Sequence, residues 1–188
     1  MEALAPLYGS FTRLALDGPA GEHGARLTFE GRPVGVLNAW GEGDLAFAAA
    51  LAAPLAACPD RGFALRCLGA IAALKAAHHP IDWIGVYRVE GADLVLTAQL
   101  LVAADHLRMP ISEGICGQVA REGRAIYVPD ATAEPGFIPC EFPTRSSFVA
   151  PIMDPDNRVI GEIELDALDP HAWDSATRTL FEAAARTI

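Results

Sequence analysis

Basic residues are scarce in this sequence of 188 residues. It has a single lysine, Lys75, and 14 lysines and arginines in all against 24 aspartates and glutamates, which gives a net charge of −10. Nucleic-acid binding requires lysine and arginine to displace the counterions of the phosphates. Binding to anionic membrane surfaces also depends on basic residues. We therefore expect neither nucleic acid nor a membrane among the partners.

Long apolar runs and a targeting signal are missing as well. A membrane helix requires about 20 uninterrupted apolar residues, and the best candidate, around Leu45–Ala57, is short and contains Pro54. The N-terminus has neither the basic segment nor the apolar core of a signal peptide. We expect a cytoplasmic protein whose four cysteines are free thiols or form transient disulfides. The sequence has no Cys-x-x-Cys, which argues against a zinc ribbon.

The cysteines fall into two kinds. Cys116 and Cys140 lie beside glycine or proline, in sequence typical of a loop or a helix start. A helix N-terminus lowers the pKa of a thiol, so we expect Cys116 to have a lowered pKa. Cys58 and Cys67 are interpreted as packing residues of the core. Redox chemistry at the first pair is the leading hypothesis, and the alternative is that both are small residues beside a cavity.

Hydrophobic periodicity and turn residues predict an α+β fold. We expect an antiparallel sheet of five or six strands flanked by helices, because two hairpin signals lie between helical segments. Residues 1–40 are interpreted as an N-terminal extension with a β-hairpin around Glu30-Gly31-Arg32, and residues 41–188 as the main domain. Helices are expected over 45–57, 60–78 and 114–122 and from 174 onward, and strands over 83–89, 94–101, 125–128, 147–153 and 159–165.

Three carboxylates alternate with apolar residues in one of these strands. Glu162, Glu164 and Asp166 therefore share one face of the sheet. Crowded carboxylates raise one another's pKa, which suits a general acid, but the same pattern also describes the solvated face of an amphipathic strand. Trp83 and Tyr87 also share a face, where they belong either to the core or to the wall of a ligand pocket.

The stretch from Trp83 to the C-terminus resembles a GAF domain, and within that superfamily the free methionine-(R)-sulfoxide reductases. The resemblance covers roughly residues 41–188. It is carried by Asp82-Trp-Ile-Gly-Val-Tyr87, Arg108-Met-Pro-Ile, Gly114-Ile-Cys-Gly117, Val128-Pro-Asp130, Pro135-Gly-Phe-Ile-Pro-Cys140-Glu, Ser146, Pro151-Ile, Val159-Ile-Gly161 and Glu164-Leu-Asp166. The combination of Gly-Ile-Cys-Gly with a second cysteine 24 positions later (140 − 116) is its most specific feature.

The resemblance implies a thiol-based reduction of free methionine sulfoxide, recycled by thioredoxin. Cys140 falls at the position of the attacking cysteine and Cys116 at that of a resolving cysteine. It assigns Glu164 and Asp166 to the family's two aspartates, so that Glu164 is the expected acid and Asp166 a substrate ligand, but it does not extend to Glu162, which stays interpreted as a solvated residue. Trp83 and Tyr87 are expected to wall the substrate.

The sequence also departs from the family pattern. A third family cysteine is His106 here, a family glutamate that helps hold the substrate is Ser147, and a family histidine is Phe137. These losses leave two alternatives: a non-catalytic GAF module that binds another small ligand, or a redox sensor acting through Cys116 and Cys140. No cofactor is expected. No metal is expected either, because one histidine and two cysteines are an incomplete zinc set. The resemblance also suggests a homodimer.

Overall fold

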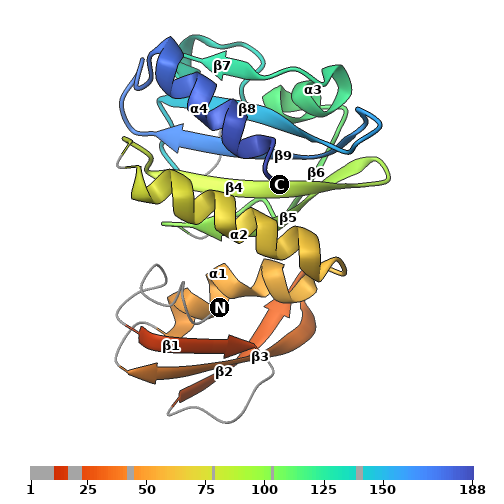
Figure 1. Cartoon of the computed structure of the whole chain (residues 1–188), viewed down its shortest axis with the longest axis vertical. Helices are drawn as coiled ribbons and strands as arrows, with labels where there is room; N and C mark the ends of the chain where they lie inside the picture. Colours follow the sequence, from red (N-terminus) through yellow and green to blue (C-terminus); the bar gives the residue numbers. More distant parts are fainter. Residues whose placement is uncertain (1–10, 17–22, 42–44, 78, 103, 139–141) are drawn as a thin grey trace.

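The computed structural model describes residues 11–16, 23–41, 45–77, 79–102, 104–138 and 142–188 (Figure 1). Its largest unit is a six-stranded sheet in which every pair of neighbouring strands is antiparallel. The strand order is β6-β5-β4-β9-β8-β7. The bounds are β4 Trp83–Glu90, β5 Asp93–Leu100, β6 Arg108–Pro110, β7 Ile126–Val128, β8 Ser146–Met153 and β9 Val159–Ala167. The predicted α+β fold with five or six antiparallel strands is confirmed.

Aspartate residues cap the start of two of the helices. The helices are α1 (Leu45–Ala57), α2 (Arg61–Ala76), α3 (Gly114–Glu122) and α4 (Ser175–Ala185). The Asp60 carboxylate accepts a hydrogen bond from the Phe63 backbone N–H at the start of α2, and Asp174 does the same for Thr177 at the start of α4. Each bond satisfies a backbone donor that the first turn of a helix leaves free. Among the described residues no helix is long and apolar enough to span a membrane.

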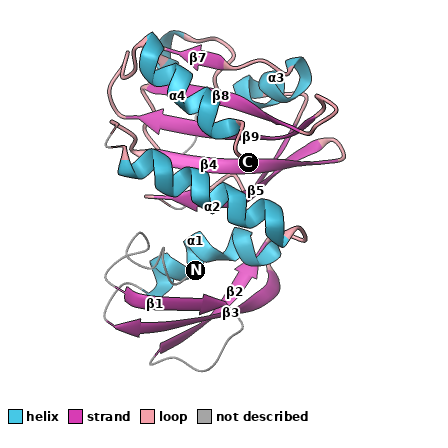
Figure 2. Ribbon diagram, in the orientation of Figure 1, coloured by secondary structure: helices cyan, strands magenta, loops and turns pink. Residues whose placement is uncertain are grey.

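Alternating residues divide the sheet into two faces with different coverings. One face carries Ile84, Val86, Ile163 and Leu165 into the main core, where α1, α2 and α4 pack. The other face carries Trp83, Tyr87 and Val149 into a second apolar cluster that includes Cys116 of α3. Figure 2 shows α2 and α4 on the near side of the sheet. The second face is left to α3 and to loops, and this is the face that holds the cavity.

A second, smaller sheet precedes the helices. It consists of β1 (Phe11–Leu16), β2 (His23–Phe29) and β3 (Arg32–Gly41) in the antiparallel order β1-β3-β2, and β2 turns into β3 at Glu30–Gly31. α1 lies between this sheet and β5 (Figure 1). Leu27 and Leu37 belong to the main core, while Phe29 belongs to the cluster on the cavity face. The small sheet is thus packed into both apolar clusters.

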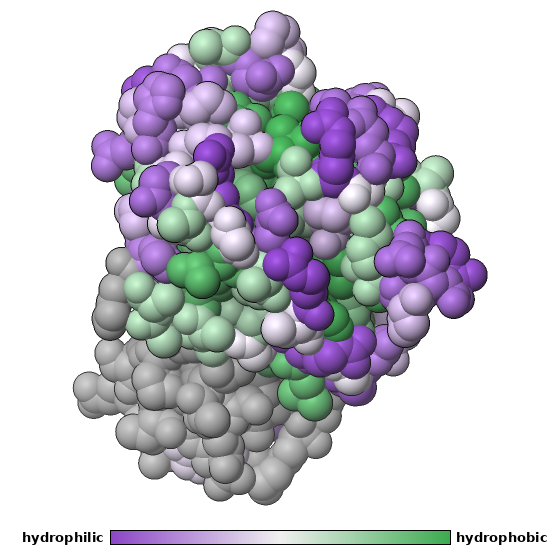
Figure 3. Space-filling model, turned by 45° about the horizontal axis from the view of Figure 1, so that its top comes forward, coloured by the Kyte–Doolittle hydropathy of each residue, from purple (hydrophilic) through white to green (hydrophobic). Residues whose placement is uncertain are grey.

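Hydrophilic residues form most of the protruding parts of the surface. On the face in Figure 3, apolar residues show mainly in the depressions between them. The exposed large apolar side chains include Leu65 of α2 and Leu180 of α4, which are 62% and 54% exposed. Single exposed apolar residues of this kind are ordinary in folded proteins.

Candidate functional site

A cavity of about 520 Å³ opens on the face of the sheet covered by α3. Its size is within the range of small-molecule sites. The floor comes from β4 and β9, one wall from β6 and the loop before it, another from the start of α3, and the rest from the segment that follows η2 (Ala131–Ala133). The lining includes Trp83, Tyr87, His106, Arg108, Met109, Cys116, Phe137, Phe142, Glu164 and Asp166.

The register of three central strands builds the floor. In the β4–β9 pair, Trp83 lies opposite Asp166 and Tyr87 opposite Glu162, while in the β8–β9 pair Ser147 lies opposite Asp166. Residues two apart on a strand share a face, and directly opposite residues on neighbouring strands share it too, so these side chains lie together on one face of the sheet. The sequence predicted a shared face for the aromatic pair and a shared face for the carboxylates. In the structure these are the same face, and Trp83, Tyr87, Glu164 and Asp166 all line the cavity there.

Packing and hydrogen bonds hold the two aromatic side chains in place. The Trp83 indole lies over Gly85, where an added Cβ would come within 2.2 Å of the ring. The indole N–H donates a hydrogen bond to the Val102 carbonyl (3.1 Å), and the Tyr87 hydroxyl donates one to the His106 carbonyl (3.1 Å). Both bonds attach the floor to the loop between β5 and β6. Fixed aromatic surfaces of this kind suit an apolar group of a small ligand.

The carboxylates of β9 are buried, which overturns the interpretation of Glu162 as a solvated residue. Glu162 is fully buried and Asp166 is 2% exposed, whereas Glu164 is half-buried and lines the cavity. The solvated-face pattern fails because β9 lies between β4 and β8 in the sheet and α3 packs against β9 and β8. The Thr144 hydroxyl donates a hydrogen bond to Asp166 Oδ2 (2.9 Å).

Burial changes the protonation of these acids. It raises the pKa of Glu162 to about 8 and that of Asp166 to about 7, because the charged form loses its hydration. The pKa of Glu164 is also raised, first by burial and then by the charges of Asp166 and Glu162. Near neutral pH the group therefore holds protons that ordinary surface carboxylates have lost.

Cys116 lies in the first turn of α3, next to these acids. Its Sγ and one carboxylate oxygen each of Glu162 and Glu164 lie within 4.8 Å of one another. Burial and the charges of the two glutamates raise the pKa of the thiol well above its usual value. The sequence expectation of a lowered pKa is therefore wrong. It counted only the partial positive charge of the helix start, which burial of the thiol and the carboxylates of β9 outweigh.

The remaining predicted residues are placed as follows. Cys140 lies outside the described residues, and its approach to the cavity stays a prediction. Ser147 is buried, and the cavity lining among the described residues does not include it. Cys58 and Cys67 are buried in the main core, as interpreted from the sequence. Burial raises the pKa of Cys67 to about 12.

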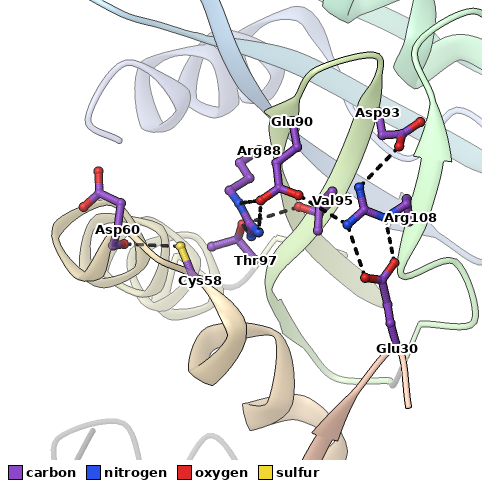
Figure 4. Close-up of polar contacts among 9 residues, drawn as sticks. All are labelled: Glu30, Cys58, Asp60, Arg88, Glu90, Asp93, Val95, Thr97 and Arg108. Carbon is purple, nitrogen blue, oxygen red and sulfur yellow. Dashed lines mark hydrogen bonds and ion pairs between the residues drawn. The ribbon is translucent and has the colours of Figure 1, made fainter. Parts of the chain in front are cut away.

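Arg108, whose polar contacts are drawn in Figure 4, is a cavity residue to which the sequence pattern assigned no role. Its guanidinium binds three carboxylates: Glu30 at the turn of the small sheet (Nε–Oε1 2.6 Å), Glu90 (3.2 Å) and Asp93 (3.3 Å). Glu90 and Asp93 flank the predicted turn between β4 and β5, so the sequence alone indicates that these two carboxylates lie close to each other. Nothing in the local sequence connects Arg108 with Glu30, 78 positions away.

Comparisons with known proteins agree with this architecture. The family model of the GAF domain matches residues 65–188. The chain is 31% identical over 120 residues to the free methionine-R-sulfoxide reductase of Saccharomyces cerevisiae, and the match covers 62% of this chain and 66% of that protein, just under two thirds of its length.

Two solved structures are similar in fold. One is the free methionine-R-sulfoxide reductase of Neisseria meningitidis in complex with its substrate, with a TM-score of 0.60 at 29% identity, covering 69% of this chain and 77% of that one. The other is the type II free methionine-R-sulfoxide reductase of Thermoplasma acidophilum, with a TM-score of 0.60 at 25% identity, covering 66% and 89%.

Proposed function

The chain belongs to the GAF domain family, and we propose that it reduces free methionine-R-sulfoxide to methionine with cysteine thiols. The observation that carries the proposal is a single cavity lined by Cys116, by the acids Glu164 and Asp166, and by the aromatic pair Trp83 and Tyr87. These are the parts that the chemistry requires: a thiol, an acid, an anion for the substrate's ammonium group and an apolar wall for its methyl group. The similarity to named reductases supports the same substrate.

The first step of the proposed reaction transfers oxygen. Glu164 donates a proton to the sulfoxide oxygen, which makes the sulfur electrophilic, and the Cys140 thiolate attacks it. The intermediate, in which Cys140 Sγ is bonded to the substrate sulfur, rearranges: the oxygen passes to Sγ with the donated proton, the sulfur–oxygen bond of the substrate and the new sulfur–sulfur bond break, methionine leaves, and Cys140 is left as a sulfenic acid. Asp166 holds the ammonium group, while Trp83 and Tyr87 enclose the methyl group. Ser147, buried opposite Asp166 on the neighbouring strand, places a hydroxyl group on the same face of the sheet as that carboxylate.

The second step restores the enzyme. The Cys116 thiol attacks the Cys140 sulfenic acid, a disulfide forms, and one water molecule is released. A dithiol of the thioredoxin type then reduces the disulfide to two thiols and is itself oxidised. This cycle requires a reducing compartment, so we place the protein in the cytoplasm. We also assign residues 41–188 to the catalytic GAF domain and propose a homodimer by similarity to the family.

A second function, ligand binding without catalysis, is favoured by one observation. The thiol of Cys116 has a raised pKa, and thiols react as thiolates. A GAF module that binds a small ligand, or one that senses oxidants through Cys116 and Cys140, would keep the same cavity without rapid turnover.

Turnover measured with a thioredoxin system separates these functions. The purified protein is given free methionine-R-sulfoxide, thioredoxin, thioredoxin reductase and NADPH, and methionine is quantified directly. The reductase proposal expects many methionines per protein molecule. Binding of the sulfoxide with no methionine released would leave the ligand-binding module as the function.

A further inference from the structure

The cavity floor and the strand that forms it hold acidic groups without a basic partner. Three carboxylates and a thiol meet there, and no arginine, lysine or histidine of the described residues forms an ion pair or hydrogen bond with Glu162, Glu164 or Asp166. Arg108 lines the same cavity but is bound to three other carboxylates. Burying charge without a partner is unfavourable, so such a floor retains protons or binds a cation.

Glu162 marks the place for a cation. Its side chain is fully buried, and neither carboxylate oxygen has a hydrogen-bonding partner among the residues that the structure describes. Its oxygen lies within 4.8 Å of both Cys116 Sγ and a Glu164 oxygen. Asp166 lies two residues beyond Glu164 on the same face. It differs from Glu162 in having a hydrogen-bonding partner, because the Thr144 hydroxyl donates to its Oδ2. The three groups of Cys116, Glu162 and Glu164 thus converge from α3 and β9.

We propose that Cys116, Glu162 and Glu164 bind a divalent cation of the zinc class. A thiolate with two carboxylates suits Zn²⁺ and its spectroscopic substitute Co²⁺, whereas Mg²⁺ and Ca²⁺ select oxygen ligands alone. Cys116 and Glu164 line the cavity, which gives the ion a path of entry and leaves a fourth position for water or a ligand. On binding, the thiol proton and any carboxyl protons pass to solvent, and no electron is transferred.

The site uses the same cavity as the proposed reductase but does not depend on that reaction. A bound cation would occupy the thiol that resolves the sulfenic acid and the carboxyl that protonates the sulfoxide. Zinc would therefore inhibit the proposed turnover, and a chelator would restore it. The inference is tested without any sulfoxide, so its failure and the failure of the proposed function are separate results.

Cobalt titration of the reduced protein tests the site. A thiolate ligand gives Co²⁺ an intense charge-transfer absorption that oxygen ligands do not give. We expect this absorption to saturate at one Co²⁺ per chain, to disappear when Zn²⁺ is added, and to be absent in Cys116→Ser. Cys67→Ala, which alters a cysteine of the main core, is the control and should keep the absorption. Circular dichroism confirms that each variant is folded.

The carboxylate ligand is tested by a matched pair of variants. Glu162→Gln should weaken Co²⁺ binding at least tenfold, because losing even an outer-shell partner of a metal site costs about 10–100-fold in affinity. Asp166→Asn removes one buried carboxylate from the same strand and face but not from the ligand set, and should weaken binding much less. Glu162→Asp, which withdraws the carboxylate by one methylene, is the second variant if the glutamine form does not fold, and should also weaken binding. A Cys116-independent absorption, or equal losses from Glu162→Gln and Asp166→Asn, would overturn the proposal.

Discussion

Glu30 and Arg108 join the small N-terminal sheet to the wall of the cavity through an ion pair with a 2.6 Å Nε–Oε1 distance. Glu30 lies at the turn between β2 and β3, and Arg108 begins β6. The neighbouring Phe29 is buried in the apolar cluster that contains Trp83 and Tyr87. The N-terminal residues outside the matched GAF region thus contact the strand that supplies one wall of the site.

Replacing Glu30 tests whether this contact positions the wall. About a third of each side chain is exposed, so the pair should contribute no more than about 1 kcal/mol to stability. We expect Glu30→Gln to raise the KM for the sulfoxide while leaving kcat nearly unchanged. Glu182→Gln, which removes the exposed pair with Arg186, is the control. An unchanged KM would show that the contact has no effect on the site.

A side chain at Gly85 should destabilise the protein, because the indole of Trp83 occupies the space above this residue. An added Cβ would lie 2.2 Å from the indole, so the ring must move. We expect Gly85→Ala to lower the free energy of unfolding by about 1–3 kcal/mol, as overpacking does, and to weaken ligand binding. Gly69→Ala in α2 meets no atom within 4 Å and serves as the control. Ligand affinity and stability equal to those of wild type would contradict the placement of the ring.

Cys116→Ser should separate the two steps of the proposed cycle. Cys140 would still accept the oxygen, so about one methionine per protein molecule should be released. The sulfenic acid would then persist, because the serine hydroxyl and His106 cannot form a disulfide with it. Rapid-quench analysis of methionine with thiol counting measures both events. Full cycling of this variant with thioredoxin would rule out Cys116 as the resolving residue.

Glu164→Gln should slow the oxygen-transfer step. An amide cannot donate the proton that a carboxylic acid donates, and a positioned acid contributes about 10²-fold or more to the rate. The measurement is the rate of methionine release in a single turnover at saturating sulfoxide. Glu134→Gln, which alters a carboxylate outside the cavity lining, is the control. A single-turnover rate within threefold of wild type would remove Glu164 from the acid role, where threefold is roughly 0.65 kcal/mol.

The fold was largely predictable, because its signals are local. Alternation placed Trp83, Tyr87, Glu164 and Asp166 on common faces, and Asp60 and Asp174 marked helix starts. The environment of each residue was not predictable in the same way. Glu162 has the pattern of a solvated strand residue, yet α3 covers its face of the sheet. The pKa of Cys116 depends on carboxylates more than 40 positions away, and the partner of Arg108 lies in another sheet. These are long-range contacts, which periodicity does not encode.

The central claim is that Cys140 takes the oxygen of a sulfoxide bound in this cavity, and single-turnover methionine release tests it most directly. Reduced wild-type protein and Cys140→Ser are mixed with excess free methionine-R-sulfoxide without thioredoxin, and methionine is quantified over time. We predict about one methionine per wild-type molecule, with loss of two thiols, and none from Cys140→Ser. Equal release from both proteins, or no release from wild type, would contradict the account.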